Sequence, residues 1–265
     1  MTATPTGKLT LRRDGALGWI VIDHPERRNA MTRAMFEALG AAVRDYAADD
    51  SVRVIVLRGS GEEAFISGGD ISEFGQNRST LDAVRAGDAI MAATYQALAD
   101  CPKPTIAMIR GYCLGGGLNV ATACDLRYAG DDARFGVPAA RLGVAYRFPA
   151  IERLANLVGA ANTAEIMFTA RQFDANDALR MGLVNRVLPA AELESSVTAT
   201  AAAMAGNAPL TIAAAKRDLI EWHKDAAARN LAECERLEDA CFASADYIEG
   251  RMAFGEKRKP QFKGR

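Results

Sequence analysis

Three consecutive glycines, Gly115–Gly117, form the stretch of the chain best suited to binding an anion. They follow an apolar, β-branched run at Thr105–Ile109, which predicts a buried strand, and they precede small residues at Leu118–Cys124, which predict a short helix. A bend of this kind presents free backbone N–H groups at the positive end of a helix dipole. The chemistry indicated is binding of a phosphate or stabilisation of a negative charge that develops during a reaction.

The glycine spacing excludes two common phosphate-binding motifs. There is no Gly-x-Gly-x-x-Gly pattern, and no lysine followed by serine or threonine closes the loop, so neither a dinucleotide fingerprint nor a Walker loop is present. A second glycine loop, Ser67-Gly68-Gly69, follows a near-continuous apolar strand at Val52–Gly59, and Asp70 can cap a helix after it. Two loops that both expose backbone N–H groups favour a paired oxyanion site.

The remaining pattern predicts the elements that position these loops. Alternating apolar residues at Leu9–Arg12 and Trp19–Ile22 predict a β-hairpin. Further helices are expected at about Arg33–Ala48 and at Leu81–Ala99, one opened by Asn207-Ala208-Pro209 and running through Trp222, and one that includes Leu231, Cys234, Leu237 and Cys241. Thr32 is expected to cap the first of these helices and Asn207 the third.

Composition and charge are those of an ordinary globular enzyme. Of 265 residues, 49% are hydrophobic and 25% charged, and the net charge is −1, so neither nucleic acid nor a membrane surface is expected as a partner. The five cysteines are odd in number and predict reduced thiols, with Cys113 a core thiol rather than a nucleophile. The first residues lack an apolar signal core, so a cytoplasmic location is expected.

Several motifs together closely resemble the crotonase (enoyl-CoA hydratase/isomerase) superfamily. They are a Lys-Pro strand followed by GYCLGGGLN and CDLRYA, the segment EAFISGGDISEF, and the tail MAFGEKRKPQF. The resemblance implies an α/β fold with a ββα spiral core and a C-terminal all-helical oligomerisation segment. It implies an acyl-CoA-binding core at residues 1–195, and helices at 196–265 that pack subunits into trimers, or hexamers built as dimers of trimers.

The same resemblance assigns roles to individual positions. The N–H groups of Gly69 and Gly116 match the two donors that hold the thioester oxygen when negative charge builds on it as an enolate. Coenzyme A is expected only as part of the substrate, with no separate cofactor and no metal. The positions that match coenzyme A contacts are Arg27, Arg28, Ser67, Asp70 and Ile71 and, from a neighbouring subunit, Phe254 and Lys257.

The two glutamates with which relatives hydrate an enoyl thioester are absent here. Their positions are occupied by Asn119, two residues after the glycine triplet, and by Ala139, after the Phe-Gly-x-Pro turn. Asparagine can hold a water molecule but cannot take its proton, and alanine can do neither. Standard two-glutamate hydration is therefore not expected, and isomerisation that depends on the second glutamate is also in doubt.

Arginine and tyrosine take the place of carboxylates along the following stretch, AARLGVAYRF. Arg141, Tyr146 and Arg147 are candidates to face the acyl end, where they would accept an anionic group. The LGVAY run most resembles methylmalonyl-CoA decarboxylases of the superfamily, which place a tyrosine at the Tyr146 position. The leading specific hypothesis is decarboxylation of a carboxyacyl-CoA. The catalytic site would then consist of Gly69, Gly116, Asn119, Tyr146 and Arg147.

Two alternatives remain. A hydratase or isomerase could use a relocated acid or base, and the candidates are Asp70, Glu73, Asp125 and Glu152, of which Asp125 is expected to be structural. Alternatively, the protein could bind acyl-CoA without turning it over. Product formation from a panel of thioesters would exclude binding alone.

Overall fold

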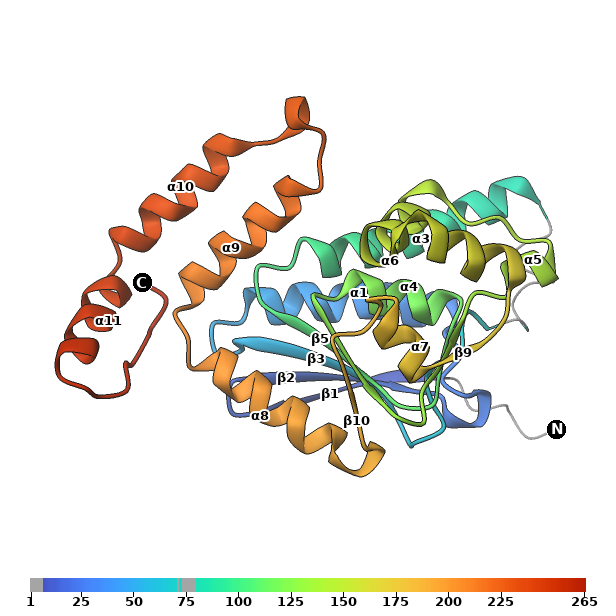
Figure 1. The fold of residues 1–265 in the computed structure, drawn as a ribbon, viewed down its shortest axis with the longest axis horizontal. Helices are drawn as coiled ribbons and strands as arrows, with labels where there is room; N and C mark the ends of the chain where they lie inside the picture. Colours follow the sequence, from blue (N-terminus) through green and yellow to red (C-terminus); the bar gives the residue numbers. More distant parts are fainter. Residues whose placement is uncertain (1–6, 71, 73–79) are drawn as a thin grey trace.

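The computed structural model describes residues 7–70, 72 and 80–265, and in this part of the chain two β-sheets are surrounded by helices (Figure 1). This confirms the predicted α/β class. Two of the predicted site positions, Ile71 and Glu73, lie outside the described residues.

The larger sheet has six strands in the described chain, in the order β1-β2-β3-β5-β7-β10. Its first pair is the predicted hairpin, in which Arg12 stands opposite Trp19, and all other neighbours are parallel. β5 is buried along its whole length because a central parallel strand is covered on both faces. The strands are Lys8–Asp14 (β1), Leu17–Asp23 (β2), Val54–Gly59 (β3), Thr105–Ile109 (β5), Leu126–Gly130 (β7) and Arg186–Leu188 (β10).

The smaller sheet has four strands among the described residues, in the order β4-β6-β8-β9. Each of three consecutive strand pairs, β3–β4, β5–β6 and β7–β8, gives its first member to the larger sheet and its second to the smaller one, and a helix follows each pair. This repetition is the predicted ββα spiral. The strands are Ala64–Ile66 (β4), Tyr112–Leu114 (β6), Arg134–Gly136 (β8) and Phe173–Asp174 (β9).

The predicted bounds of α1 and α3 and the predicted end of α9 at Trp222 are confirmed. Thr32 Oγ1 accepts a hydrogen bond from the Met35 N–H over 3.2 Å, as expected of a cap. The predicted cap of α9 is wrong, because Ala208 occupies that position and Asn207 lies one residue too early. The helices are Arg33–Ala48 (α1), Leu81–Ala99 (α3), Gly116–Ala123 (α4), Ala139–Leu142 (α5), Phe148–Thr169 (α6), Ala175–Arg180 (α7), Leu193–Ala205 (α8), Pro209–Trp222 (α9), Leu231–Phe242 (α10) and Ala245–Gly255 (α11).

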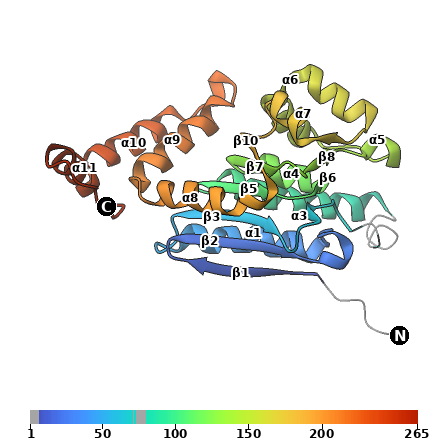
Figure 2. The same ribbon diagram turned by 60° about the horizontal axis from the view of Figure 1, so that its bottom comes forward.

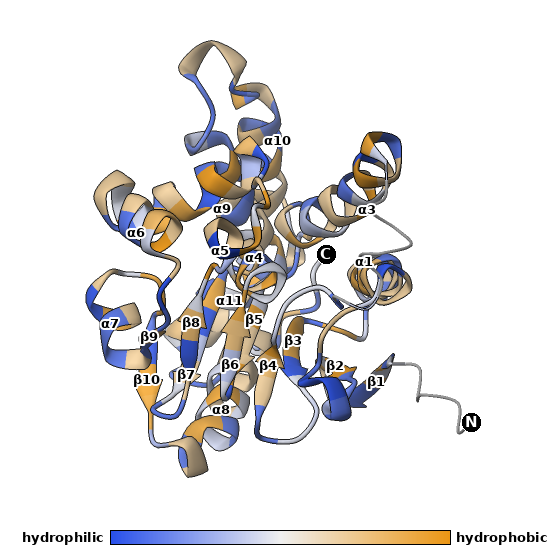
Figure 3. Cartoon of the chain, turned by 90° about the vertical axis from the view of Figure 1, so that its right-hand side faces the viewer, coloured by the Kyte–Doolittle hydropathy of each residue, from blue (hydrophilic) through white to orange (hydrophobic). Residues whose placement is uncertain are grey.

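The larger sheet separates two hydrophobic cores. On one face, Trp19, Val56 and Ile106 pack against Val197 of α8 (Figure 2). On the other face lies the larger core, which includes α1, the smaller sheet and α4. Hydrophobic colour accordingly gathers on β3, an inner strand of the larger sheet, whereas outer helices such as α9 and α10 carry both colours (Figure 3).

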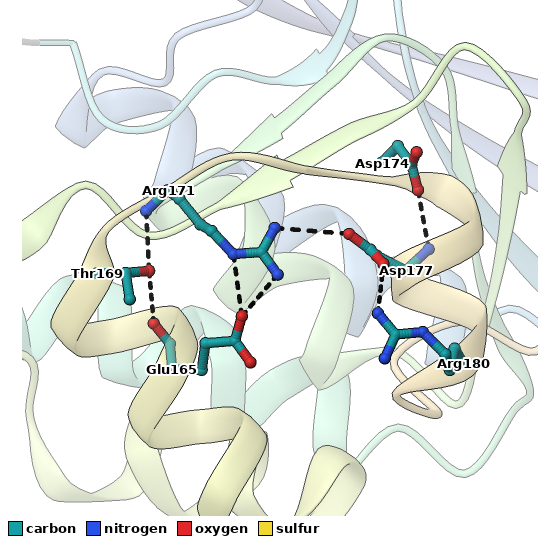
Figure 4. A network of polar contacts seen from close by, with 6 residues as sticks. All are labelled: Glu165, Thr169, Arg171, Asp174, Asp177 and Arg180. Carbon is teal, nitrogen blue, oxygen red and sulfur yellow. Dashed lines mark hydrogen bonds and ion pairs between the residues drawn. The ribbon is translucent and has the colours of Figure 1, made fainter.

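A network of charges joins the end of α6 to α7 (Figure 4). Arg171 lies 2.6 Å from Glu165 on α6 and 3.5 Å from Asp177 on α7. Asp177 also pairs with Arg180, and its N–H donates to the capping carboxylate of Asp174 over 2.8 Å. These contacts hold the α6–α7 turn together beside β9.

Helices α9, α10 and α11 form an arm that lies apart from the sheets (Figures 1 and 2). Its base is attached by Lys216 of α9, whose Nζ lies 2.8 Å from Asp125 Oδ2. Large apolar side chains exposed on the arm include Leu219, Trp222, Leu231, Phe242, Ile248 and Phe254. A division into domains near residue 195 stays a prediction. No helix in the described ranges is both long and apolar enough to cross a membrane.

Candidate active site

The loop after β4 leaves the backbone N–H of Gly69 unpaired among the described residues. Gly68 has a φ of +125°, a conformation that favours glycine, and Gly69 forms an isolated bridge with Met31. The hydrogen bonds of this bridge are donated by the N–H groups of Met31, to Gly68 O, and of Asp70, to Met31 O, each over 2.9 Å. The N–H of Gly69 therefore donates to no acceptor in the described part of the chain.

The first turn of α4 supplies a second such donor. Gly116 is the first residue of the helix, so its N–H has no intrahelical partner, and no other acceptor is found for it among the described residues. At Gly117, α4 packs so closely on β4 that a Cβ atom would lie 2.1 Å from the Ile66 carbonyl oxygen. A Cβ atom on Gly116 would lie 3.5 Å from the nitrogen of Gly69, so the two glycine loops are in contact.

A cavity of about 270 Å³ opens at this contact, with Gly69 and Gly116 in its wall. The rest of the wall comes from α3, α4 and the segment that runs from β8 through α5 into α6. Side chains in the wall include Asp88, Met91, Tyr95, Asn119, Ala139, Tyr146, Arg147 and Arg153.

The two positions that the resemblance matches to glutamates both face this cavity. Asn119 lies on α4 and Ala139 begins α5, and both belong to the cavity wall. Tyr146 also lines it and lies beside the glycine bend, since a Cβ atom on Gly115 would be 3.5 Å from its hydroxyl oxygen. The cavity therefore combines two N–H donors that have no acceptor among the described residues with the amide of Asn119, the methyl group of Ala139 and the phenol of Tyr146.

The structure does not bring Arg141 or Glu152 to the cavity. Both side chains are exposed, and neither belongs to the wall, because α5 and the start of α6 turn them towards solvent. Arg147 does line the cavity, but its guanidinium already forms an ion pair with Asp88, 2.6 Å away. An incoming anion would have to compete with that carboxylate for Arg147.

Sequence analysis missed two charged residues of the wall, Asp88 and Arg153. A signal for Asp88 existed, because Asp88, Met91 and Tyr95 recur at the spacing of one helix face and all line the cavity. Arg153 lies on α6, six residues after Arg147, and its guanidinium carbon is 5.2 Å from the centre of the Tyr95 ring. No local pattern distinguished it from the exposed arginines nearby.

The predicted coenzyme A loop lies against the first glycine loop. Arg28 O accepts a hydrogen bond from the Ser67 N–H over 3.1 Å, and Arg27 O accepts one from the Ser67 hydroxyl over 3.3 Å. The Arg28 guanidinium is engaged with Glu63, 2.7 Å away, whereas the Arg27 side chain is exposed. The segments at 27–28 and 67–69 thus form one surface at the cavity mouth.

The Asp70 carboxylate accepts hydrogen bonds from the N–H and the hydroxyl of Ser72 over 2.9 and 2.7 Å, and the helix that Asp70 was expected to cap falls largely on residues outside the described ranges. Burial tends to raise the pKa of Asp70, but the hydrogen bonds from Ser72 outweigh it, so this pKa lies below its ordinary value. Asp70 does not belong to the cavity wall.

Asp125 accepts a hydrogen bond from the Thr105 N–H over 2.7 Å and another from the Lys216 side chain. These contacts give Asp125 a structural role.

The other predicted positions lie away from the cavity. Phe254 of α11 is 89% exposed and Lys257 follows the same helix, so both belong to the arm and not to the cavity of their own chain. Cys113 is buried and burial raises the pKa of its thiol, which agrees with a core residue. None of the five cysteines forms a disulfide.

Comparison with known proteins agrees with this geometry. The family described as enoyl-CoA hydratase/isomerase matches residues 12–265. A short-chain-enoyl-CoA hydratase of Clostridium acetobutylicum is 32% identical over 96% of this chain and 97% of its own. A peroxisomal Delta(3,5)-Delta(2,4)-dienoyl-CoA isomerase of Arabidopsis thaliana is 32% identical over 94% of this chain and 93% of its own.

Solved structures show the same fold. An enoyl-CoA hydratase/carnithine racemase from Magnetospirillum magneticum superposes with a TM-score of 0.90 at 35% identity, over 97% of this chain and 96% of that one. The chain belongs to the enoyl-CoA hydratase/isomerase family of the crotonase superfamily. The methylmalonyl-CoA decarboxylase-like subtype suggested by the LGVAY run is not among these findings and stays a hypothesis.

Proposed function

We propose that this enzyme converts an acyl-CoA thioester through an enolate whose oxygen is held by the N–H groups of Gly69 and Gly116. The observation that carries the proposal is that these two donors are adjacent in the cavity wall and have no acceptor in the described part of the chain. Fixed donors that await a developing negative charge lower the barrier because they need no reorganisation during the reaction.

The reaction proposed is decarboxylation of a carboxyacyl-CoA. The bond between Cα and the carboxylate carbon breaks, carbon dioxide leaves, and the bonding electrons form the enolate, whose oxygen lies between the two N–H donors. Cα then takes a proton from solvent, which completes the balance. These reaction steps need no carboxylate base, and they are therefore compatible with Asn119 and Ala139 at the two glutamate positions.

A second candidate is hydration or isomerisation with Asp88 as a relocated acid–base group. Asp88 lines the same cavity, and relatives of this chain are named as hydratases and as an isomerase. Its ion pair with Arg147 counts against the role, because a carboxylate held by a guanidinium is a weaker base.

Substrate binding would use the surface formed by the two loops at 27–28 and 67–69, with the CoA phosphates near Arg27. Assembly into a trimer or a dimer of trimers would bring Phe254 and Lys257 of one subunit to the coenzyme A of another. The exposed apolar side chains of the arm support such assembly, since faces of this kind are buried in subunit contacts.

Mass spectrometry of thioesters incubated with the purified protein tests the reaction. The panel contains crotonyl-CoA, a 3-enoyl-CoA and methylmalonyl-CoA. Release of carbon dioxide from methylmalonyl-CoA supports decarboxylation. Addition of water to crotonyl-CoA at an enzymatic rate favours the Asp88 candidate, and binding without any product favours a non-catalytic role.

A further inference from the structure

Arg153 is a charged residue of the cavity wall and has no ionic partner among the residues that the structure describes. In the described part of the chain its guanidinium forms no hydrogen bond or ion pair, and its Nε is buried without an acceptor. Its contact is with the face of the Tyr95 ring, at 5.2 Å. Burial lowers the pKa of the Arg153 guanidinium, but an arginine remains protonated at neutral pH.

The other charged residues of the wall do not neutralise the charge of Arg153. Asp88 and Arg147 neutralise each other at a distance of 2.6 Å, so Arg153 supplies the net positive charge of the described cavity wall. Buried donors without acceptors are uncommon because each one costs desolvation energy, and an anionic ligand removes that cost when it binds. The contact with Tyr95 holds the guanidinium in place and leaves its N–H edge available.

We propose that Arg153 recognises a carboxylate on the acyl group, so that the substrates of this enzyme are carboxyacyl-CoA thioesters rather than neutral ones. This inference rests on the proposed function only in placing the acyl group in the cavity beside Gly69 and Gly116. Arg153 is then a specificity-determining residue, and Arg147 is not, because Asp88 occupies it.

The guanidinium of Arg153 changes the relative affinity of the enzyme for charged and neutral acyl groups. A hydrogen bond between a guanidinium and a carboxylate inside a protein changes affinity by roughly 10- to 100-fold. A neutral acyl group of the same length would leave the donors of Arg153 unsatisfied. The enzyme is therefore expected to bind succinyl-CoA about tenfold or more tightly than butyryl-CoA, which has a methyl group where succinyl-CoA has the carboxylate.

Isothermal titration calorimetry with matched pairs of thioesters tests this. The pairs are malonyl- with propionyl-CoA, succinyl- with butyryl-CoA and glutaryl- with valeryl-CoA, which move the carboxylate stepwise away from the thioester. Arg153→Met should abolish the preference for the charged member of the preferred pair while keeping the affinity for the neutral one. Arg153→Lys should retain part of it, and Arg141→Met, which removes an exposed arginine outside the cavity, should retain all of it.

A wild-type protein without preference for any charged thioester would overturn the inference, as would an unchanged preference in Arg153→Met. If circular dichroism shows that Arg153→Met is misfolded, Arg153→Lys is the deciding variant. A preference for charged thioesters that is as large in Arg153→Lys as in Arg141→Met would mean that the guanidinium group of Arg153 has no role in it. Binding preference needs no turnover. If the preference depends on Arg153 but no carbon dioxide is released, decarboxylation is refuted and this inference stands. If carbon dioxide is released but the preference does not depend on Arg153, decarboxylation stands and this inference is refuted.

Discussion

Asp88 Oδ2 lies 2.6 Å from Nη2 of Arg147, and this ion pair joins α3 to the residue before α6 across the wall of the cavity. More than half of the Arg147 side chain is exposed, so the pair adds little to the free energy of folding. Its effect is on the cavity, where it neutralises one carboxylate and one guanidinium that would otherwise both be available to the substrate.

Replacing Asp88 separates the two candidate reactions. Asp88→Asn removes a carboxylate from the cavity wall and releases Arg147, so decarboxylation should continue and carboxyacyl-CoA should bind several-fold more tightly. Hydration that depends on Asp88 should instead fall by roughly 100-fold or more. Steady-state kinetics with methylmalonyl-CoA and crotonyl-CoA measure both effects.

The control for this change is Asp82→Asn on the same helix. Asp82 is 93% exposed and pairs with Arg85 outside the cavity, so neither reaction should respond. Loss of decarboxylation in Asp88→Asn alone would mean that the carboxylate takes part in the reaction, contrary to the proposed mechanism.

The oxyanion donors are tested by Gly116→Pro, which deletes one N–H. Proline is tolerated at the first residue of a helix, where Gly116 stands, so the fold should survive. Loss of one such donor lowers kcat by roughly 100- to 1,000-fold, or about 3 kcal/mol. Gly116→Ala keeps the N–H, and its Cβ atom would make only ordinary contacts at 3.5 Å, so it is the matched control. Full turnover by the folded proline variant would disprove the assignment.

The attachment of the arm depends on Lys216. Its buried Nζ lies 2.8 Å from Asp125 Oδ2 and donates to Lys103 O over 3.0 Å. Lys216→Met should lower the free energy of unfolding by about 1–3 kcal/mol, towards the smaller value because a third of the Asp125 side chain meets solvent. Urea denaturation measures the loss, and Arg85→Met, at an exposed pair, should change stability by less than about 0.5 kcal/mol. Equal effects of the two changes would contradict the role given to Lys216.

Glu249 makes the end of the arm sensitive to acid. The hydrogen bonds from Arg258, over 2.6 and 2.8 Å, and one from the Gln261 N–H hold its pKa at about 2, below its ordinary 4.5. Because the folded-state pKa is lowered, the ionised carboxylate stabilises the arm fully above about pH 4.5, and this contribution is lost as the pH falls through about 2.

The variant Glu249→Gln should therefore be less stable than the wild type at neutral pH, and the difference should shrink as the pH falls below about 4.5. Denaturant titrations of both proteins across this range measure it. Glu235→Gln, at an exposed position on α10, should show no such convergence. A difference between wild type and Glu249→Gln that stays constant with pH would refute the linkage.

Much of the fold followed from local patterns. The strand at Thr105–Ile109, the helices α1 and α3 and the end of α9 were predicted with the bounds the structure has, because apolar periodicity, caps and prolines act over a few residues. The resemblance of the motifs to a known superfamily supplied the order of the spiral. The cap of α9 was misassigned because two adjacent residues, Asn207 and Ala208, both precede the proline.

The two glycine loops could also be located from the chain alone, and the resemblance to the superfamily assigned the two N–H donors to Gly69 and Gly116. The environment of the charged side chains in the cavity could not be predicted from the chain alone. Arg141, Arg147 and Arg153 are spaced six residues apart, yet one is exposed, one is paired with Asp88 and one lies over Tyr95. Backbone donors are set by local conformation, whereas the charge that a substrate meets depends on how α3 and α6 pack against each other across the cavity, and only the tertiary structure decides that.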